Sequence, residues 1–312
     1  MFLLLLWTVV LIALLEATTA APDIKDIISG CGELCKASAG TFVGGKYFKE
    51  RSVPVDCGSI FDEKVFVLDG HGETRAPENL PEEWINEFTL DGRVIVKPWY
   101  FNRPYVGKKS MTPEWSYEHV ESMIAKAKDG TLKGTYPKID TTALMEGLSR
   151  APGVVGGHVL VIGSEMPWVE ACVLASGAAN VTTLEYGAII SKHPSIRTML
   201  PGDYRKIWAT LPPFDAIVTY SSVEHSGLGR YGDALNPWGD VLEIARAWCV
   251  AKQGASLTIA VPSGSVDHIL HNAHRIYGPI RYPYLTSNWR QLWKNENHKI
   301  RFEQYTHVFT KP

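Results

Sequence analysis

The sequence predicts an α/β protein with a doubly wound, mostly parallel sheet of the Rossmann-like type. Three continuous apolar runs rich in β-branched residues, at 158–162, 215–220 and 255–261, are typical of parallel strands covered on both faces. Helical segments are expected between some of them, at about 168–176 and 236–250. Because strands and helices alternate, we expect helices on both faces of one sheet.

Five further elements complete the predicted domain. Strands at 181–185 and 196–200 extend the parallel part of the sheet, and the tail, Arg301–Thr310, has strand character that could add an antiparallel edge. Ahead of the core, Thr112-Pro113-Glu114 is a favourable helix start, and that helix should run to about Lys128. A second helix is expected from a cap at Asp140 to Arg150.

The chain has 312 residues, 45% of them hydrophobic, which suffices for one large domain with an appendage. The region before about residue 110 is irregular, with short strand-like runs at 65–68 and 93–96. The predicted organisation is a leader, an N-terminal extension and an α/β domain, at residues 1–20, 21–110 and 111–312.

The first segment resembles a secretory leader. Phe2–Leu15 is almost unbroken apolar sequence, shorter than the roughly 20 residues that a membrane span needs. Small side chains favour cleavage before Ala21, whereas the absence of Lys or Arg ahead of the run leaves an uncleaved membrane anchor as the alternative. We expect entry into the secretory pathway, in the ER or Golgi lumen or outside the cell. Asn180-Val181-Thr182 is then a glycosylation sequon at the sheet edge opposite the predicted site.

Charge and cysteine content narrow the function classes. The net charge of −2 provides no basic field for nucleic acid, so nucleic-acid binding is not expected. Cys172 and Cys249 lie on predicted apolar helices and are expected to be free core residues. In an oxidising lumen, one disulfide is plausible among Cys31, Cys35 and Cys57, with three possible pairings.

A cofactor site is predicted where the first two strands end. Gly163, Ser164 and Glu165 form the turn between strand and helix, where unpaired backbone N–H groups can face a cofactor. The alternative is an ordinary βα turn without a ligand. Glu185 ends the second strand, where a carboxylate can accept two ribose hydroxyls or face solvent. Asp203, after the third strand, is a candidate for an adenine amino group or a turn residue.

The segment 221–240 carries the densest set of polar side chains, directly after the fourth strand. In open α/β sheets ligands bind at this edge, and Ser221 is placed at the cofactor. Glu224 and His225 are the candidate acid–base pair, because a carboxylate beside a histidine can hold it and raise its pKa. The alternative is a structural His225 that bonds a backbone carbonyl.

The same segment contains a possible substrate contact. Gly227, Gly229 and Gly232 spell G-x-G-x-x-G, but they do not follow a strand directly, so we do not interpret them as a dinucleotide fingerprint. A loop that holds a substrate anion against Arg230, with Tyr231 beside it, is the favoured interpretation.

A histidine cluster follows the fifth strand. His268, His271 and His274 resemble a metal set if the segment is helical, but matching carboxylates are lacking apart from Asp267, so no metal is predicted. Substrate contact is favoured instead for His274 and for the two residues Arg275 and Tyr277, with the guanidinium holding a phosphate or carboxylate.

These motifs together resemble a family of unknown function. The matching segments are VLVIGSEMPWVEA, VTTLEYG, SSVEHSGLGRYGD, NPWGD, VPSG and NAHRIYG, within residues 110 to 312. The family is similar to a divergent class I methyltransferase that uses S-adenosylmethionine (SAM), and some members accompany glycan-assembly genes. The resemblance implies a seven-stranded sheet with a final antiparallel strand, and SAM across the first two strand tips. It makes Glu185 the ribose acid and Gly163 the surviving part of a glycine-rich turn whose other glycines are missing.

The function predicted from the sequence is therefore a SAM-dependent methyltransferase-like protein, acting on a hydroxyl or carboxylate of a small molecule or glycan. Two alternatives stay open. One is a catalytically silent member that binds a sugar or nucleotide, and the other is a metal-assisted glycan-processing enzyme. A membrane partner is expected only if the leader stays uncleaved.

Overall fold

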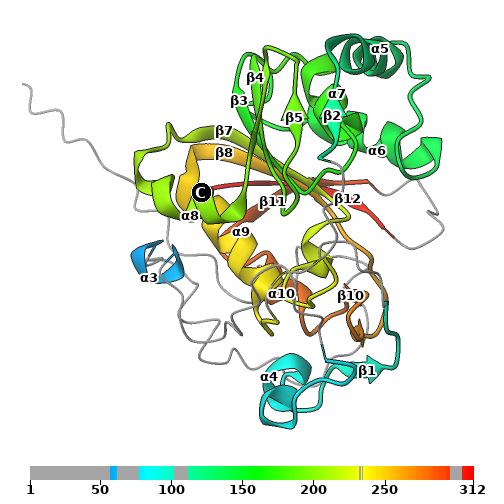
Figure 1. Cartoon of the computed structure of the whole chain (residues 1–312), viewed down its shortest axis with the longest axis vertical. Coiled ribbons are helices and arrows are strands. Elements are labelled where there is room, and N and C mark those ends of the chain that lie inside the picture. The colour runs from blue at the N-terminus through cyan, green and yellow to red at the C-terminus, as the bar shows by residue number, and fades with distance from the viewer. Residues whose placement is uncertain (1–56, 62–76, 102–111, 232, 234, 296–303) are drawn as a thin grey trace, which may run out of the picture.

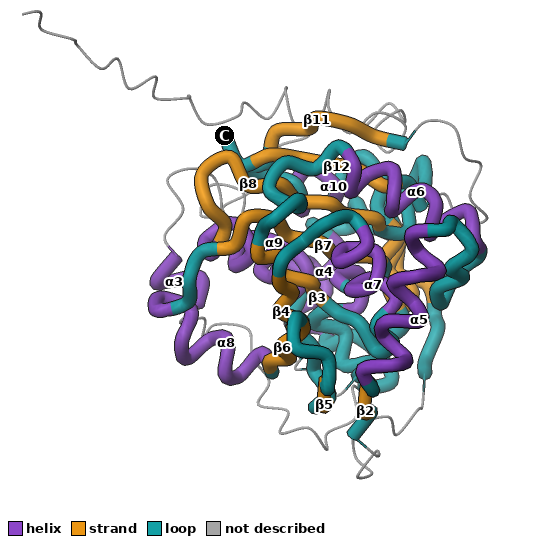
Figure 2. Tube along the Cα trace, turned by 90° about the horizontal axis from the view of Figure 1, so that it is seen from above, coloured by secondary structure: helices purple, strands orange, loops and turns teal. Residues whose placement is uncertain are grey.

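A computed structural model describes residues 57–61, 77–101, 112–231, 233, 235–295 and 304–312. Its centre is a seven-stranded sheet with the order β11-β12-β8-β7-β3-β4-β6. The strands in that order span Arg290–Lys294, Thr306–Thr310, Ala251–Ala260, Phe214–Tyr220, His158–Ile162, Asn180–Leu184 and Ile196–Met199. The five strands from β8 to β6 are parallel, and β12 is antiparallel to both neighbours (Figures 1 and 2). The predicted doubly wound, methyltransferase-like α/β fold is confirmed.

Helices cover both faces of this sheet, because alternate strand residues are apolar on both sides. Val159 and Val161 of β3 pack in one buried cluster with a first set of helices, which lies at the upper right of Figure 1. Leu160 and Ile162 pack in a second cluster, with the other helices. The first set is α5, α6 and α7, at Tyr117–Lys128, Lys138–Ser149 and Trp168–Ala175; the second includes α9, α8 and α10, at Gly239–Val250, Pro201–Ile207 and Tyr282–Leu285.

The two helices ahead of the core begin differently from the prediction. α5 starts at Tyr117, because the Ser116 hydroxyl accepts the His119 N–H and caps the helix. Glu114 instead lies in β2 (Glu114–Trp115), which pairs with β5 (Ile190–Ser191). In α6, Pro137 occupies the cap position, and Asp140 lies inside the first turn, where its buried carboxylate accepts the Tyr220 hydroxyl.

The C-terminal strand is internal, not at an edge. β12 lies between β8 and β11, and β11 forms the edge that the sequence did not predict. Within the described ranges no helix has the length and apolar character to span a bilayer. The predicted leader 1–20, the anchor 2–15, the strand at 65–68, Cys31 and Cys35 lie outside the described residues.

A smaller three-stranded sheet joins the N-terminal extension to the loops after β8. β1 (Ile95–Lys97) pairs parallel with β9 (His268–Leu270), which pairs antiparallel with β10 (His274–Ile276). The histidine segment is not helical, as a metal set there would require: His268 and His274 lie on strands, and His271 in the turn between them bonds the Pro77 carbonyl. The remaining short helical elements are α3, η2, α4, η3 and η4, at Cys57–Phe61, Glu82–Trp84, Ile85–Thr89, Trp208–Thr210 and Val223–His225.

A disulfide fixes α3 on the core. Cys57 pairs with Cys249 of α9, so the prediction that Cys249 is free is wrong, and so is any pairing of Cys57 with Cys31 or Cys35. Sequence spacing could not find this bond, because 192 residues separate its partners. The Phe61 ring at the end of α3 also contacts the core, because it stacks on the Trp208 ring with the ring centroids 4.5 Å apart. Cys172 is a free, buried thiol, as predicted.

Replacing both bonded cysteines, in Cys57→Ser/Cys249→Ser, should lower the free energy of unfolding by about 2–5 kcal/mol, because the bond restricts a long loop of the unfolded chain. Urea unfolding with and without a reducing agent measures this. The reductant should destabilise wild type and the Cys172→Ala control, but leave the double variant unchanged. Equal sensitivity of all three proteins would show that the bond does not form.

Candidate functional site

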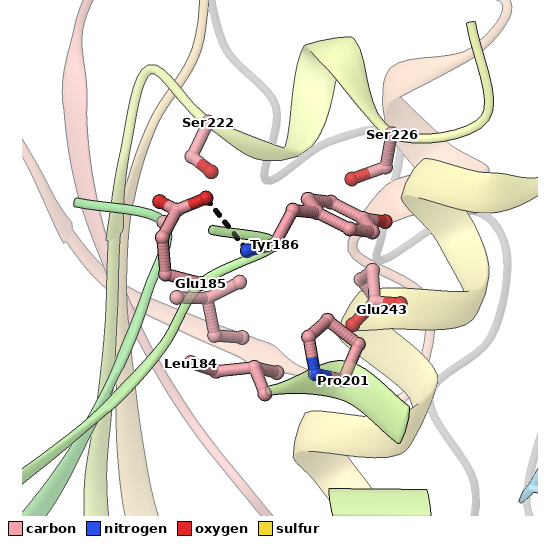
Figure 3. Close-up of a pocket in the computed structure, with 9 residues that line it drawn as sticks. Leu184, Glu185, Tyr186, Pro201, Ser222, Ser226 and Glu243 are labelled. Carbon is pink, nitrogen blue, oxygen red and sulfur yellow. Dashed lines mark hydrogen bonds between the residues drawn. The ribbon is translucent and has the colours of Figure 1, made fainter. Parts of the chain in front are cut away.

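A hollow of about 260 Å³, counting its open mouth, lies where β3, β4 and β7 end. Its walls come from the strand tips, the start of α8 and the neighbouring face of α9 (Figure 3). The residues that line it are Ile162, Gly163, Leu184, Glu185, Tyr186, Pro201, Ser222, Ser226 and Glu243. The sequence predicts a cofactor site at this edge of the sheet, and that role stays a prediction.

Glu185 lies at the wall of the hollow and joins two strand tips. One carboxylate oxygen accepts the Ser164 N–H at 2.8 Å. The other accepts the N–H of the neighbouring Tyr186 at 2.7 Å (Figure 3). Burial raises the pKa of Glu185, and the bonds from Ser164, Tyr186 and Gly187 N–H groups oppose that rise. A carboxylate offers about four lone-pair positions, so capacity remains for a ligand hydroxyl.

The turn after β3 lies in close contact with the loop that follows β7. Gly163 has φ 76°, and a Cβ atom there would overlap the Ser222 hydroxyl. Glycine is therefore required both by the left-handed backbone and by the close approach of the two loops. Its predicted role beside a cofactor stays a prediction, although Gly163 does line the hollow.

Ser164 turns its hydroxyl away from the hollow, toward a buried acid that the sequence did not single out. Its Oγ lies 2.8 Å from both the Met166 carbonyl and Glu170 Oε2. A hydroxyl has only one proton, so Glu170 must donate to Ser164 if Ser164 donates to Met166. Burial raises the pKa of Glu170 to about 7, against the Thr183 bond, which agrees with a protonated acid. Ser164 does not line the hollow, and its predicted place beside a cofactor stays a prediction.

Tyr186 occupies part of the hollow. Its ring extends between Ser226 and Glu243 (Figure 3), while 38% of the residue stays exposed. Burial of the phenol and the nearby Glu243 carboxylate raise the pKa of Tyr186 well above its usual value. A ring at this point can either contact a bound ligand or block its entry.

The charge of the hollow is acidic. Its lining includes the carboxylates of Glu185 and Glu243 but, among the described residues, no Lys or Arg. Arg246 pairs with Glu243 at 2.6 Å from the adjacent turn of α9, which leaves Glu185 as the carboxylate without such a cation among the lining residues. Phosphate groups need cationic or N–H donors, so this lining suits a neutral or positively charged ligand.

A second polar cluster lies at the end of β7. Ser221 Oγ is 2.5 Å from Glu224 Oε1, and the same oxygen is 3.7 Å from His225 Nε2. Glu224 is completely buried, and burial raises its pKa to about 7 against the Ser221 bond. His225 Nδ1 lies 2.6 Å from the Ala273 carbonyl, which makes Nδ1 the protonated nitrogen. Burial, followed by the Arg230 charge, lowers the pKa of His225 to about 3.

Arg230 is partly exposed beside this cluster. Its NH1 donates to the Ala273 carbonyl at 3.1 Å, and its guanidinium lies 4.6 Å from the Phe101 ring centroid and 5.0 Å from that of Tyr231. His274 is half-buried nearby, where burial and Arg230 lower its pKa to about 4. The predicted group of Arg230, Tyr231 and His274 is thus brought together around His225.

The glycine loop before Arg230 does not hold an external anion. Asp233 accepts the N–H groups of Gly227, Gly229 and Tyr231 at 2.7, 3.3 and 3.2 Å. The chain's own carboxylate therefore fills the place predicted for a substrate anion. Gly232 of the same motif lies outside the described residues.

Three further predictions are corrected. Arg275 and Tyr277 have no exposed surface, so neither is placed to contact substrate; they bind the buried Asp240, at 3.6 and 2.8 Å. Although burial opposes it, Arg275 and Arg281 lower the pKa of Asp240 to about 2. Asp203 is 61% exposed and pairs with Lys206 on α8, away from the hollow that Pro201 reaches.

Other site residues were missed or remain predictions. Sequence reasoning did not single out Ser226 or Glu243, and for Tyr186 the only signal was its position directly after Glu185. Glu165 is exposed and does not line the hollow, so its cofactor role stays a prediction. In the described part of the chain, no group of three or more His, Cys, Asp or Glu side chains is arranged to hold a metal ion.

Residues 156–306 match a family model described as "Caenorhabditis protein of unknown function, DUF268". This region is similar to the DUF268 family. It runs from the start of β3 to the first residue of β12 and contains both polar sites. The family resemblance drawn from the sequence motifs is confirmed. No curated protein matches the chain in sequence.

Several solved structures resemble this protein at low identity. The N-methyltransferase NodS of Bradyrhizobium japonicum WM9, in complex with S-adenosyl-L-homocysteine (SAH), is 13% identical with a TM-score of 0.40, over 63% of this chain and 98% of that one. The cyclase SpnF is 10% identical with a TM-score of 0.41, over 66% and 99%. The fibrillarin pre-rRNA processing protein of Methanococcus jannaschii is 12% identical with a TM-score of 0.36, over 51% and 68%. The fold itself is defined by the strand order of the sheet.

Changing Gly163 to Ala should destabilise the protein by about 1–3 kcal/mol, because the new methyl group overlaps Ser222 and the backbone is left-handed. Thermal unfolding measures the change. Gly187→Ala is the matched control, since a Cβ there meets nothing within 4 Å. Adding Ser222→Gly should restore part of the loss; no difference between Gly163→Ala and Gly187→Ala would refute the packing.

The buried Glu170 should make stability depend on pH. Its folded pKa, about 7, lies above the unfolded value near 4.5, so folding is penalised increasingly as pH rises between these values and fully above pH 7. Glu170→Gln should match wild type near pH 4 and exceed it by a few kcal/mol above pH 7. Urea unfolding at pH 4 to 8 tests this, with the surface variant Glu146→Gln as control. A pH-independent difference would contradict the protonated state.

Proposed function

We propose that this protein is a SAM-dependent methyltransferase whose cofactor site is the hollow beside Glu185. The observation that carries the proposal is the acidic lining at the tips of the first two parallel strands. SAM has a ribose diol and a positively charged sulfonium but no phosphate. These features match a lining that has carboxylate acceptors and no Lys or Arg. Dinucleotides and nucleotide sugars instead carry phosphates, which this lining does not bind.

Two properties of the hollow bear on whether SAM fits it: the groups that can bind the cofactor, and its size. Glu185 keeps acceptor capacity for a ribose hydroxyl, and the Tyr186 ring is placed to contact a flat base. The volume of about 260 Å³ includes the open mouth of the hollow, so the Tyr186 ring has to move aside before a ligand of the size of SAM can enter. When bound, SAM would supply a methyl group on a cationic sulfur.

The neighbouring cluster is the proposed acceptor site. Glu224 and His225 lie one loop away from the hollow, since Ser222 and Ser226 on either side of them line it. Arg230, with the Phe101 and Tyr231 rings, forms a partly exposed wall that can orient a small molecule or glycan. Orientation of the acceptor in line with the methyl group supplies much of the rate acceleration in such reactions.

Action in the secretory pathway is part of the proposal. It is supported by the Cys57–Cys249 disulfide, because such bonds persist in oxidising compartments. It is also supported by the exposed Asn180 of the sequon, at the amino end of β4 and thus opposite the hollow. A lumenal enzyme of this kind needs SAM delivered from the cytosol.

One observation favours a second candidate, a catalytically silent protein that binds a small ligand. The Tyr186 ring fills part of the hollow, and the first turn retains one glycine only. Such a protein would bind a sugar or nucleoside without transferring a methyl group. SAM-binding measurements separate the two candidates.

Isothermal titration calorimetry should show that the purified protein binds SAM and SAH, and binds NAD and UDP-glucose at least tenfold more weakly. Glu185→Gln, which keeps the size of the side chain, should weaken SAM binding by about tenfold or more, equivalent to about 1.4 kcal/mol. Glu146→Gln is the surface control, and thermal unfolding reports whether each variant folds. Tighter binding of a phosphate-bearing ligand, or no binding of SAM, would refute the proposal.

A further inference from the structure

We propose that the acceptor is a sugar hydroxyl, and that Ser221 and Glu224 form a two-step relay that removes its proton, with His225 as a positioning residue. This inference rests on the proposed methyl transfer. It assigns roles that the sequence did not, since Ser221 was expected at the cofactor and His225 was a candidate base.

The first observation is the backbone of Ser221. It has φ 49°, in the left-handed region that few residues other than glycine adopt. Its N–H is held by the Ala260 carbonyl, so the conformation is fixed by β8. Such strain at the end of a central strand is typical of functional positions. The result is a hydroxyl at the carboxyl end of β7, next to Ser222, which lines the hollow.

The second observation is the hydrogen bonding of Glu224. Its side chain is completely buried, and Oε1 accepts from Ser221 at 2.5 Å. Oε2 is buried without a hydrogen-bond partner. Leaving such an atom unpaired is costly, which a purely structural role does not explain. The unpaired Oε2 leaves ionised Glu224 poorly stabilised, which favours uptake of the Ser221 proton at Oε1.

Tyr136 completes the chain of hydroxyl groups. It comes from the loop between α5 and α6, and its phenol hydrogen-bonds Ser221 while lying in the field of Glu224. Burial and Glu224 raise the pKa of Tyr136 to about 12, so the phenol remains a neutral donor. Ser221 is thus placed between a donor and an acceptor, as a group that relays a proton requires.

His225 is not suited to accept the acceptor's proton. Its Nδ1 is bound by the Ala273 carbonyl and is 3.2 Å from Arg230 NH1, and its Nε2 faces Glu224 Oε1 at 3.7 Å. With a pKa of about 3 the ring stays neutral at physiological pH and is a weak base. The neutral His225 ring at this distance shields Glu224 from water and leaves the charge of the ionised carboxylate uncompensated.

The charges around Glu224 leave its protonation balanced near neutral pH. Burial raises its pKa to about 7, whereas Ser221 and then the charges of Arg230 and Arg275 oppose the rise. The titratable and charged groups that face it come from the loop before α6, the loop after η4 and the β10 region: Tyr136, His225, Arg230, Tyr231, Arg275 and Tyr277. A general base works best with a pKa near the operating pH.

The relay selects the class of acceptor. A carboxylate has no proton to lose and would be repelled by ionised Glu224, so the base would serve no purpose. A sugar hydroxyl must lose its proton, and its apolar ring face suits the Phe101 and Tyr231 rings beside Arg230.

The atoms balance as follows. The acceptor proton passes to Ser221 Oγ as the Ser221 proton passes to ionised Glu224. The acceptor oxygen forms a bond to the methyl carbon, the carbon–sulfur bond of the sulfonium donor breaks, and its electron pair stays on the sulfur. The products are a methyl ether and a neutral thioether, with protonated Glu224.

The test uses the full chain with methyl-deuterated SAM and three probe acceptors: methyl glucoside, methyl glucuronate and methyl N-acetylglucosaminide. Mass spectrometry measures methyl ether formation between pH 5.5 and 9. Wild type should methylate at least one hydroxyl, with a rate that rises with pH through about 7 and then levels. Glu224→Gln and Ser221→Ala should each reduce the rate by about 10²–10⁴-fold and remove the rise with pH. His225→Gln should lose less than tenfold and keep that rise.

Two further measurements distinguish the possible failures. Calorimetry shows whether SAM binds each variant: absence of binding to wild type refutes the proposed function and the relay with it. If SAM binds but no hydroxyl probe is methylated, or Glu224→Gln keeps the wild-type profile, only the relay is overturned. Infrared difference spectra report the carboxyl proton directly: a band that titrates near pH 7 and is lost in Glu224→Gln supports the relay, and ionised Glu224 throughout overturns it.

Discussion

The candidate site depends on one carboxylate that binds backbone N–H groups from two neighbouring strand tips. Glu185 ends β4 and accepts from Ser164, in the turn after β3, and from its own neighbour Tyr186. Parallel strands bring their carboxyl ends to one edge, but loops at that edge have few ladder bonds to fix them. The Glu185 bonds supply that restraint, so one residue both shapes the hollow and gives it its charge.

Buried acids with raised pKa values surround this arrangement. Glu170 lies beneath the first turn and Glu224 beneath the end of β7, each bonded to a serine hydroxyl from the strand tip above it. In both cases burial is the main cause of the raised pKa. The two differ in one respect: both oxygens of Glu170 have partners, whereas Oε2 of Glu224 has none. That difference separates a structural acid from a candidate catalytic one.

The sequence predicted those features that depend on local pattern. The runs 158–162 and 215–220 became central strands, because apolar residues on both faces leave few other solutions, and Glu185 was found from its place at a strand end. Features set by distant partners were not predictable. From the sequence, Arg275 was predicted to bind a substrate. In the structure, Asp240 and the Ser226 carbonyl hold its guanidinium in the interior. Cys249 was predicted to be a free core thiol, whereas it forms a disulfide with Cys57. The glycines before Arg230 suggested an anion site, but Asp233 fills it.

The central claim is that the hollow beside Glu185 holds a nucleoside without phosphate. Mass spectrometry of small molecules released from the purified full chain tests this most directly, because it does not require a known acceptor. The account predicts that SAM or SAH is released by wild type, and that neither is released by Glu185→Gln. Recovery of a phosphate-bearing nucleotide from wild type, retained in Glu185→Gln, would contradict it.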